Sequence, residues 1–137
     1  MNDAVLAYLE VERVAPAGTN RMWVIDGYSL STHPDLCEHL ERLNDAAGKS
    51  ATFAYRFGRP VLEAAGVIVA FAAGTHIMCV RVPRGAVDAR LLVEARPDLG
   101  REWTRVDPFT VDVPRAEGHA LLAALIQRAV DDVVSAP

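Results

Sequence analysis

Apolar residues recur at helical spacing in two segments of the chain. Between Pro34 and Gly48, leucines stand four and three positions apart, with charged side chains between them (Leu36, Leu40 and Leu43). Thr32 or His33 is the expected cap, since proline favours the first helical position that follows it. The pattern predicts an amphipathic helix that buries its leucines and ends at Gly48.

The second helical segment runs from Gly118 to Val134. Its apolar positions form one continuous stripe (Leu121, Leu122, Leu125, Ile126, Ala129, Val130, Val133 and Val134). This is the strongest periodic signal in the sequence, and it predicts a helix packed along its length against a core.

Between these helices the pattern is typical of strands. Residues 51–57 alternate aromatic with smaller or polar side chains, and residues 66–73 are rich in Val, Ile and Phe. In residues 76–82, both the odd-numbered and the even-numbered positions are apolar, so both sides of the expected strand are apolar. Gly58-Arg59-Pro60 is expected to break the first strand, and Ala73-Gly74-Thr75 to form a hairpin turn. A strand that is apolar on both sides needs cover on both sides. We expect helices on one face, and the N-terminal segment or a second subunit on the other.

Shorter elements are predicted between the sheet and the last helix. Val87, Leu91 and Leu92 favour a helix that stops near Pro97. Residues 103–106 and 109–113 each have the alternation of a short strand.

The first 30 residues allow two interpretations. Alternation over residues 5–12 and an apolar run at 21–25 favour an N-terminal β-hairpin, with turns at 15–20 and at Asp26-Gly27. Val5, Leu6 and Leu9 behind Asn2 and Asp3 also suit a short capped helix. We favour the hairpin and keep the helix as the alternative.

These elements predict one α+β domain over residues 1–137. Residues 31–137 form its core: an antiparallel sheet of about five strands with helices packed on one face. Residues 1–30 are an extension of this core. Adjacent strands are joined by turns too short for a parallel crossover, which excludes a doubly wound α/β fold.

Composition narrows the classes of function. With 51% hydrophobic residues and 23% charged residues over 137 positions, the chain has the composition of a packed globular domain. The net charge of −4 disfavours duplex DNA or an anionic membrane as the main partner. Lys49 is the only lysine among 14 basic residues, and the richness in arginine and alanine suggests a bacterial genome of high GC content.

We expect a cytoplasmic protein, because the sequence shows neither a signal-peptide pattern nor a membrane-spanning run. No signal-peptide pattern opens the sequence, and the longest apolar run, residues 64–73, is far short of the roughly 20 residues that span a bilayer. Cys37 and Cys79 stand in apolar stretches and are expected to be buried free thiols.

Two clusters of histidine and cysteine are candidates for catalytic or metal sites. His33 and Cys37 have the spacing of two ligands on one helix face, but Cys37 belongs to the leucine stripe and His39 points away from it, so no metal or cofactor is expected. His76 and Cys79 are three apart on a strand and project to opposite faces. They cannot form a nucleophile–base couple there, and we expect no catalytic residues.

Arginines are the strongest candidates for a binding site. Arg56, Arg81 and Arg105 each occupy a predicted strand, and a small antiparallel sheet can bring them to one face. Trp103 or Tyr55 would supply a stacking surface for a phosphate, a carboxylate or single-stranded nucleic acid. The candidate ligand- or nucleic-acid-binding residues are Arg56, Arg81, Arg105, Trp103 and His76. The alternative is that the arginines form ion pairs with neighbouring acidic residues (Glu63, Glu94, Asp98, Glu102 and Asp107).

Four segments resemble the MmcQ/YjbR family of small bacterial proteins. They are the apolar strand after a glycine at 66–71, the strand that carries Arg81 at 79–83, the strand that carries Trp103 at 101–106, and the terminal helix. TfoX N-terminal domains look similar here. The sequence departs from the family at Arg81, where a lysine is usual, and at Ala129-Val130, where a Ser-Tyr pair is common. The resemblance implies a CyaY-like fold and suggests nucleic-acid binding.

Three functions follow as hypotheses. The first is a non-enzymatic binding or interaction domain that forms a homodimer through the second apolar face of the sheet. The second is a nucleic-acid-associated regulator of the MmcQ/YjbR or TfoX kind that uses the arginine-bearing face. The third is a small enzyme with an unrecognised site, for which His76 is the candidate centre. We favour the first.

Overall fold

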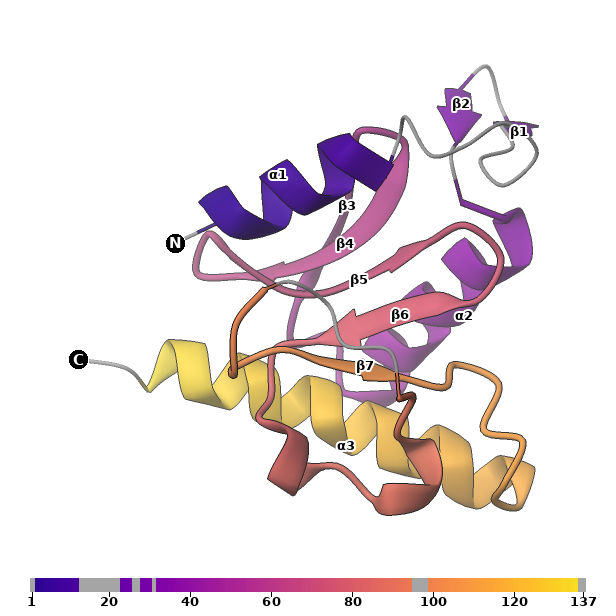
Figure 1. The fold of residues 1–137 in the computed structure, drawn as a ribbon, viewed down its shortest axis with the longest axis vertical. Helices are drawn as coiled ribbons and strands as arrows, with labels where there is room; N and C mark the ends of the chain where they lie inside the picture. Colours follow the sequence, from indigo (N-terminus) through magenta and orange to yellow (C-terminus); the bar gives the residue numbers. More distant parts are fainter. Residues whose placement is uncertain (1, 13–22, 26–27, 31, 95–98, 136–137) are drawn as a thin grey trace.

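A computed structural model describes residues 2–12, 23–25, 28–30, 32–94 and 99–135. A sheet lies in the middle of the molecule, with helix α1 on one side and helix α3 on the other (Figure 1). The predicted α+β class with an antiparallel sheet is confirmed. The predicted turns at 15–20 and 26–27, and the predicted helix end near Pro97, lie outside the described residues.

Five strands form the main sheet as a meander in the order β3-β4-β5-β6-β7. Every neighbouring pair is antiparallel. The strands are β3 (Thr52–Arg56), β4 (Arg59–Ala64), β5 (Val67–Ala73), β6 (Ile77–Val80) and β7 (Thr104–Val106). A separate two-stranded sheet pairs β1 (Trp23–Ile25) with β2 (Tyr28–Leu30).

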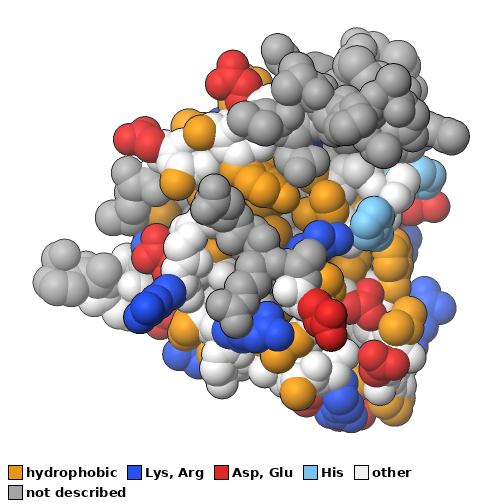
Figure 2. All heavy atoms as spheres, viewed as in Figure 1, with side chains coloured by type: hydrophobic (Ala, Val, Ile, Leu, Met, Phe, Trp, Pro, Cys, Tyr) orange, Lys and Arg blue, Asp and Glu red, His pale blue; other side chains and the backbone are white. Residues whose placement is uncertain are grey.

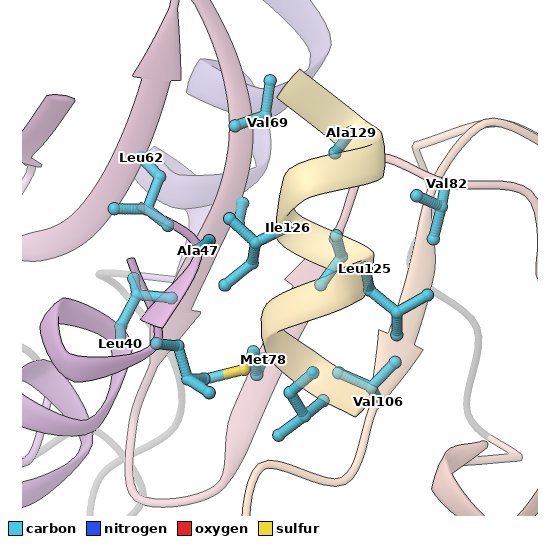
Figure 3. Close-up of a cluster of buried hydrophobic side chains, with 14 of the residues drawn as sticks. Leu40, Ala47, Leu62, Val69, Met78, Val82, Val106, Leu125, Ile126 and Ala129 are labelled. Atoms are coloured by element: carbon cyan, nitrogen blue, oxygen red, sulfur yellow. The ribbon is translucent and has the colours of Figure 1, made fainter. Parts of the chain in front are cut away.

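Helices α2 (Pro34–Ala46) and α3 (Arg115–Val134) cover one face of the main sheet. Figure 3 shows side chains of α3 between those of the strands and of α2. Leu40 of α2, Leu62 and Met78 of the sheet and Ile126 of α3 are all fully buried in this core. The predicted helical stripes are therefore the surfaces that meet the sheet, except that Val134 at the end of α3 is 64% exposed.

The start of α2 confirms the predicted cap. His33 is the N-cap residue, and its Nδ1 accepts a hydrogen bond from the Asp35 N–H at 3.1 Å. The His33 N–H donates to the Gly74 carbonyl at 2.7 Å, which fixes the entry of α2 beside the turn between β5 and β6.

Helix α1 (Asp3–Glu12) covers the opposite face, which we call the α1 face. Val5 and Leu9 are buried there against Val61, Phe71 and Cys79. The strand favoured for residues 5–12 is wrong, and the helical alternative is correct, because a four-residue spacing lets both side chains reach the sheet. The N-terminal segment thus supplies the cover that the second apolar face required. While α2 and α3 pack on one face as predicted, α1 adds a third helix on the other.

The strand β4 was missed because Arg59-Pro60 was interpreted as part of a turn. The turn is formed by Phe57 and Gly58 alone, with φ angles of 54° and 74°. Two left-handed residues make a type I′ hairpin, so Arg59 and Pro60 already pair with β3. Pro60 faces Tyr55 in this ladder, at a position where it need not donate to β3.

Two predicted elements between residues 83 and 114 are wrong. The helix expected from Val87 onward is replaced by two short 3₁₀ turns, Arg84–Ala86 and Ala89–Leu91. The strand expected over 109–113 is a turn, because Asp107 accepts hydrogen bonds from the N–H groups of Phe109 and Val111, both at 2.9 Å. Across the described residues, the structure contains no helix long and apolar enough to cross a membrane.

Candidate functional site

All three predicted arginines belong to the α1 face. Arg105 pairs with Cys79, and Arg56 stands two positions from Ala54, while both Cys79 and Ala54 pack on the α1 side. Arg81 follows Cys79 by two positions, and its N–H donates to the Val69 carbonyl at 2.8 Å, which continues the ladder beyond β6. Residues two apart on a strand share a face, so the sheet register places the three together on one side.

The arginines nevertheless divide into two groups. Arg56 lies on β3, at one edge of the sheet, and Arg105 lies on β7, at the other. Four strand spacings of about 4.8 Å separate these edges by roughly 19 Å. The guanidinium of Arg56 bonds to the Glu63 carboxylate at 2.6 Å. Arg56 therefore forms the ion pair that the sequence analysis gave as the alternative.

Arg81 and Arg105 are diagonal neighbours at the β6/β7 end of the sheet. In the antiparallel register the position opposite Arg81 is Trp103, and Arg105 stands two positions further along β7. Diagonal neighbours on one face lie about 7–8 Å apart at their backbones, within reach of two arginine side chains. Arg81 stands 3.9 Å from a Glu102 carboxylate that is itself 62% exposed, so this pair is loose and well solvated.

Arg105 has no acid beside it among the described residues. Its Nε is buried and has no hydrogen-bond partner, and no ion pair joins its guanidinium to a carboxylate of the described residues. The nearby Asp107 uses both carboxylate oxygens to hold the turn that follows β7. A buried donor without an acceptor costs about 1–3 kcal/mol. The Nε of Arg59 on the same face is in the same position, but Arg59 is 1% exposed and donates from Nη1 to the Phe57 carbonyl at 3.0 Å, whereas Arg105 is only partly buried and within reach of a ligand.

Trp103 is part of the core of the α1 face. The residue is 6% exposed, and its ring lies 5.5 Å from that of Phe71, which in turn lies 5.5 Å from Tyr8 of α1. Trp103 therefore presents no open ring surface for a base or a ligand. Tyr55, the other stacking candidate, is 44% exposed but lies on the opposite face, where its ring packs edge-to-face on Phe53. Trp103 is thus next to Arg81 and Arg105 in the sheet, but its ring is covered and cannot stack on a ligand.

His76 is exposed in the turn between β5 and β6. Its Nδ1 lies 3.0 Å from the Thr75 hydroxyl. The strand β6 begins at Ile77, so the prediction that His76 and Cys79 share one strand is wrong: His76 lies in the turn, while Cys79 is fully buried on the α1 face. The surface seen in Figure 2 places hydrophobic side chains in the middle, with basic and histidine side chains beside them.

The histidines and the cysteine at the start of α2 each have a separate structural role. His33 caps the helix, the buried Cys37 thiol lies 3.8 Å from the Thr32 carbonyl, and His39 donates from Nε2 to the Pro108 carbonyl at 2.6 Å. Burial raises the pKa of Cys37 to about 11, and burial also lowers the pKa of His39. No three His, Cys, Asp or Glu side chains of the described residues are grouped to hold a metal ion.

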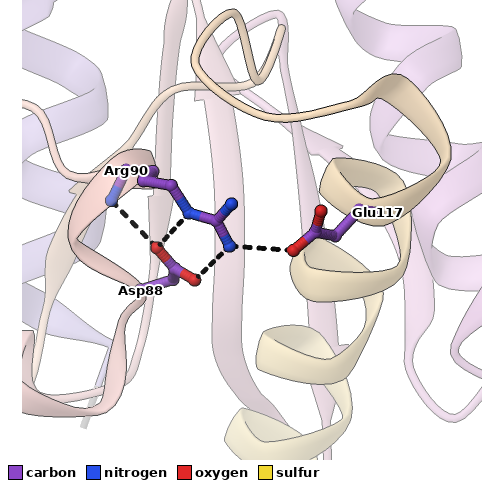
Figure 4. Close-up of polar contacts among 3 residues, drawn as sticks. All are labelled: Asp88, Arg90 and Glu117. Carbon is purple, nitrogen blue, oxygen red and sulfur yellow. Dashed lines mark hydrogen bonds and ion pairs between the residues drawn. The ribbon is translucent and has the colours of Figure 1, made fainter.

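Two polar features were missed by the sequence analysis. Arg59 is 1% exposed on the α1 face beside Arg56, and the signal for it was the short Phe57-Gly58 turn, which makes Arg59 a strand residue. Figure 4 shows Arg90 between Asp88 and Glu117. The hydrogen bonds from Arg90 hold the pKa of Asp88 down at about 2. This exposed network ties the second 3₁₀ turn to the first turn of α3.

A shallow groove of about 450 Å³ lies between α2 and α3. Small side chains make up most of its lining (Ala46, Ala47, Ala116, His119, Ala120, Ala123, Ala124 and Gln127). Of these lining residues, His119 and Gln127 alone have side chains that can donate or accept hydrogen bonds. The groove therefore offers far less for recognition than the arginines of the α1 face.

No family model, curated protein or solved structure matches the chain. The resemblance to the MmcQ/YjbR family and the CyaY-like assignment therefore stay predictions.

Proposed function

We propose that this chain is a non-enzymatic binding domain that holds a carboxylate or phosphate group of its ligand at Arg105, with Arg81 beside it. The observation that carries the proposal is the part-buried Arg105 guanidinium, whose Nε has no acceptor. Guanidinium groups have five donors and no acceptor, and they match the paired oxygens of carboxylates and phosphates. Such an oxygen would remove the cost of the unsatisfied Nε.

Binding is favoured over catalysis by the state of the nucleophiles. Cys37 and Cys79 are buried, and the raised pKa of Cys37 keeps its thiol protonated at neutral pH. His39 is committed to a backbone carbonyl at 2.6 Å. Cys79 is the cross-strand partner of Arg105, but it is fully buried and so is closed to a substrate.

A single anionic group is favoured over an extended nucleic acid. Nucleic-acid binding needs several cations along one path and exposed rings on which bases stack. Here Arg56 is bonded to Glu63 at the far edge of the sheet and Trp103 is buried. The net charge of −4 also opposes a long polyanion. The regulator hypothesis is therefore the weaker of the two.

A titration with inorganic phosphate tests the proposal through the Nε–Hε signals of the arginines in ¹⁵N NMR spectra. We expect the Arg105 signal to shift and saturate together with that of Arg81, and the Arg81 response to be lost in Arg105→Gln. Arg128→Gln is the matched control, because Arg128 is an exposed arginine of α3 that stands 3.8 Å from Asp132. Its substitution should leave the Arg105 response unchanged. The proposal is wrong if the Arg105 signal moves no further than that of Arg128.

A short single-stranded oligonucleotide of mixed sequence is the second probe. Binding that is much tighter than that of phosphate, falls steeply with salt and is weakened equally by Arg56→Gln would favour the regulator hypothesis instead.

A further inference from the structure

The outer edge of β3 is an unpaired strand edge. β3 is the first strand of the meander, and the described residues supply it with one neighbour, β4. The opposite edge of the sheet is covered differently: Leu92 bridges to Val106, and the Val93 N–H approaches the Arg105 carbonyl at 3.4 Å. Of the two edges of the described sheet, the β3 side is therefore the one whose outward backbone groups pair with no other described strand.

The hairpin geometry decides which backbone groups these are. In a two-residue type I′ hairpin the residues that flank the turn, Arg56 and Arg59, exchange hydrogen bonds. Bonded and non-bonded pairs then alternate along an antiparallel ladder. The N–H and carbonyl groups of Phe53 and Tyr55 consequently point away from β4. The Tyr55 carbonyl receives only an exposed bond from the Arg56 side chain at 3.2 Å.

The side chains of β3 carry little of the usual protection of an edge. The strand contains no proline, lysine or bulge against its neighbour, and its one charged side chain is already bonded to Glu63. The rings of Phe53 and Tyr55 form an edge-to-face pair with centroids 5.2 Å apart, and Tyr55 is 44% exposed. An aromatic strip thus runs along an edge that is open to pairing.

We propose that β3 pairs antiparallel with β3 of a second copy of this chain, with Ala54 facing Ala54 of the partner subunit at the twofold axis. This register sets Phe53 against Tyr55 of the partner subunit. It also makes these two residues the bonded pair, as their outward N–H and carbonyl groups require. The two sheets would join into one continuous sheet of ten strands, five from each copy.

Charge complementarity favours a second copy as the occupant. The register sets Thr52 opposite Arg56 of the partner subunit, and Thr52 stands beside Glu63 in its own ladder. Each Arg56 would thus approach the acidic side of the other copy. A register with Arg56 facing Arg56 of the partner subunit would instead be opposed by like charges. The strip is short, so we expect a dimer that forms at high concentration.

Sedimentation velocity over a concentration series tests the proposal with two substitutions of opposite charge. Thr52→Lys places a cation opposite Arg56 of the partner subunit and should raise the dimer dissociation constant about tenfold, because the contact occurs twice. Thr52→Glu should lower it. Within one chain the signs reverse, since the introduced lysine would face Glu63 and the introduced glutamate would be repelled by it. Dimerisation and folding stability therefore move in opposite directions, which a general loss of folding cannot imitate.

Tyr55→Lys provides a second test and Phe109→Lys its matched control. Tyr55 and Phe109 are both exposed aromatic residues, but only Tyr55 lies on β3. The first substitution should abolish the dimer and the second should leave it intact. A chain that stays monomeric at the highest concentration reached, or a dimer that ignores Thr52→Lys, Thr52→Glu and Tyr55→Lys, overturns the proposal. Arg105 lies at the other edge, so its phosphate response is independent of this result.

Discussion

Gly118 of α3 is packed so closely against Thr110 that a β-carbon at position 118 would overlap the threonine hydroxyl and Cβ. Glycine inside a helix normally costs about 1 kcal/mol relative to alanine. Here we expect Gly118→Ala to destabilise the fold by about 1–3 kcal/mol, because the added methyl forces the 107–113 turn away from α3. Urea denaturation followed by circular dichroism measures this change.

The companion variant is Thr110→Gly. Thr110 has a φ of 48°, a conformation that glycine adopts without strain. In the background of Gly118→Ala this second substitution should recover stability. A Gly118→Ala chain that is more stable than the natural sequence would show that the contact does not restrain the helix.

Arg105→Met should leave the free energy of unfolding unchanged or raise it slightly. The substitution removes a donor that has no acceptor and keeps an apolar stem over the sheet. Arg56→Met is the comparison, since it removes a real ion pair with Glu63 and should cost up to about 1 kcal/mol. A loss of more than this in Arg105→Met would mean that Arg105 stabilises the fold itself, and would count against a role in binding.

Leu9→Ala tests the contribution of α1. Leu9 is fully buried against the sheet, so we expect a loss of about 2–4 kcal/mol in the free energy of unfolding. Because α1 covers Cys79, the same substitution should speed the reaction of that thiol with a disulfide reagent. The reaction is followed in a Cys37→Ser background. Ala7→Ser, at an exposed position of the same helix, should change neither quantity.

Stability should fall at alkaline pH through Cys37. Its pKa is raised by burial to about 11 in the folded chain, against 9.0 for the ordinary thiol. Between these values the unfolded chain releases the proton while the folded chain retains it, so stability is full below about pH 9 and decreases towards about pH 11. The total loss is about 1–3 kcal/mol.

The matched variant for this titration is Cys37→Ala, which has no proton to release. Urea midpoints measured at about pH 8 and about pH 10.5 should fall more steeply in the natural chain than in this variant. Equal slopes would contradict the assignment.

Helices with a long stripe of apolar residues could be predicted from the sequence. The predictions that failed concern short segments. Leu36, Leu40 and Leu43 fit only a helix, and α2 has the predicted cap. Residues 5–12 fit both periods, and the choice depends on tertiary packing, since Val5 and Leu9 find the apolar residues of the sheet. The turn after β7 depends on one carboxylate, that of Asp107, which overrides the alternation of residues 109–113.

The sequence could predict which arginines belong to the candidate site, but not which side chains contact them. Their strand positions allowed Arg56, Arg81 and Arg105 to share one face, and the register of the sheet brings them there. Which of them is neutralised depends on distance across the sheet, and the sequence does not show that Glu63 reaches Arg56. Trp103 is a second example: it becomes a core residue only because Phe71 and α1 pack against it, and the sequence does not show these contacts.

The position of α1 has a consequence for synthesis of the chain. Val5 and Leu9 leave the ribosome well before their partners, which include Cys79, about 70 residues later. At translation rates of roughly 5–20 residues per second, several seconds pass before the helix can dock. During that interval the nascent α1 segment and the incomplete sheet both expose hydrophobic surfaces. The step most sensitive to chaperones and to misassembly is therefore the closing of this long-range contact.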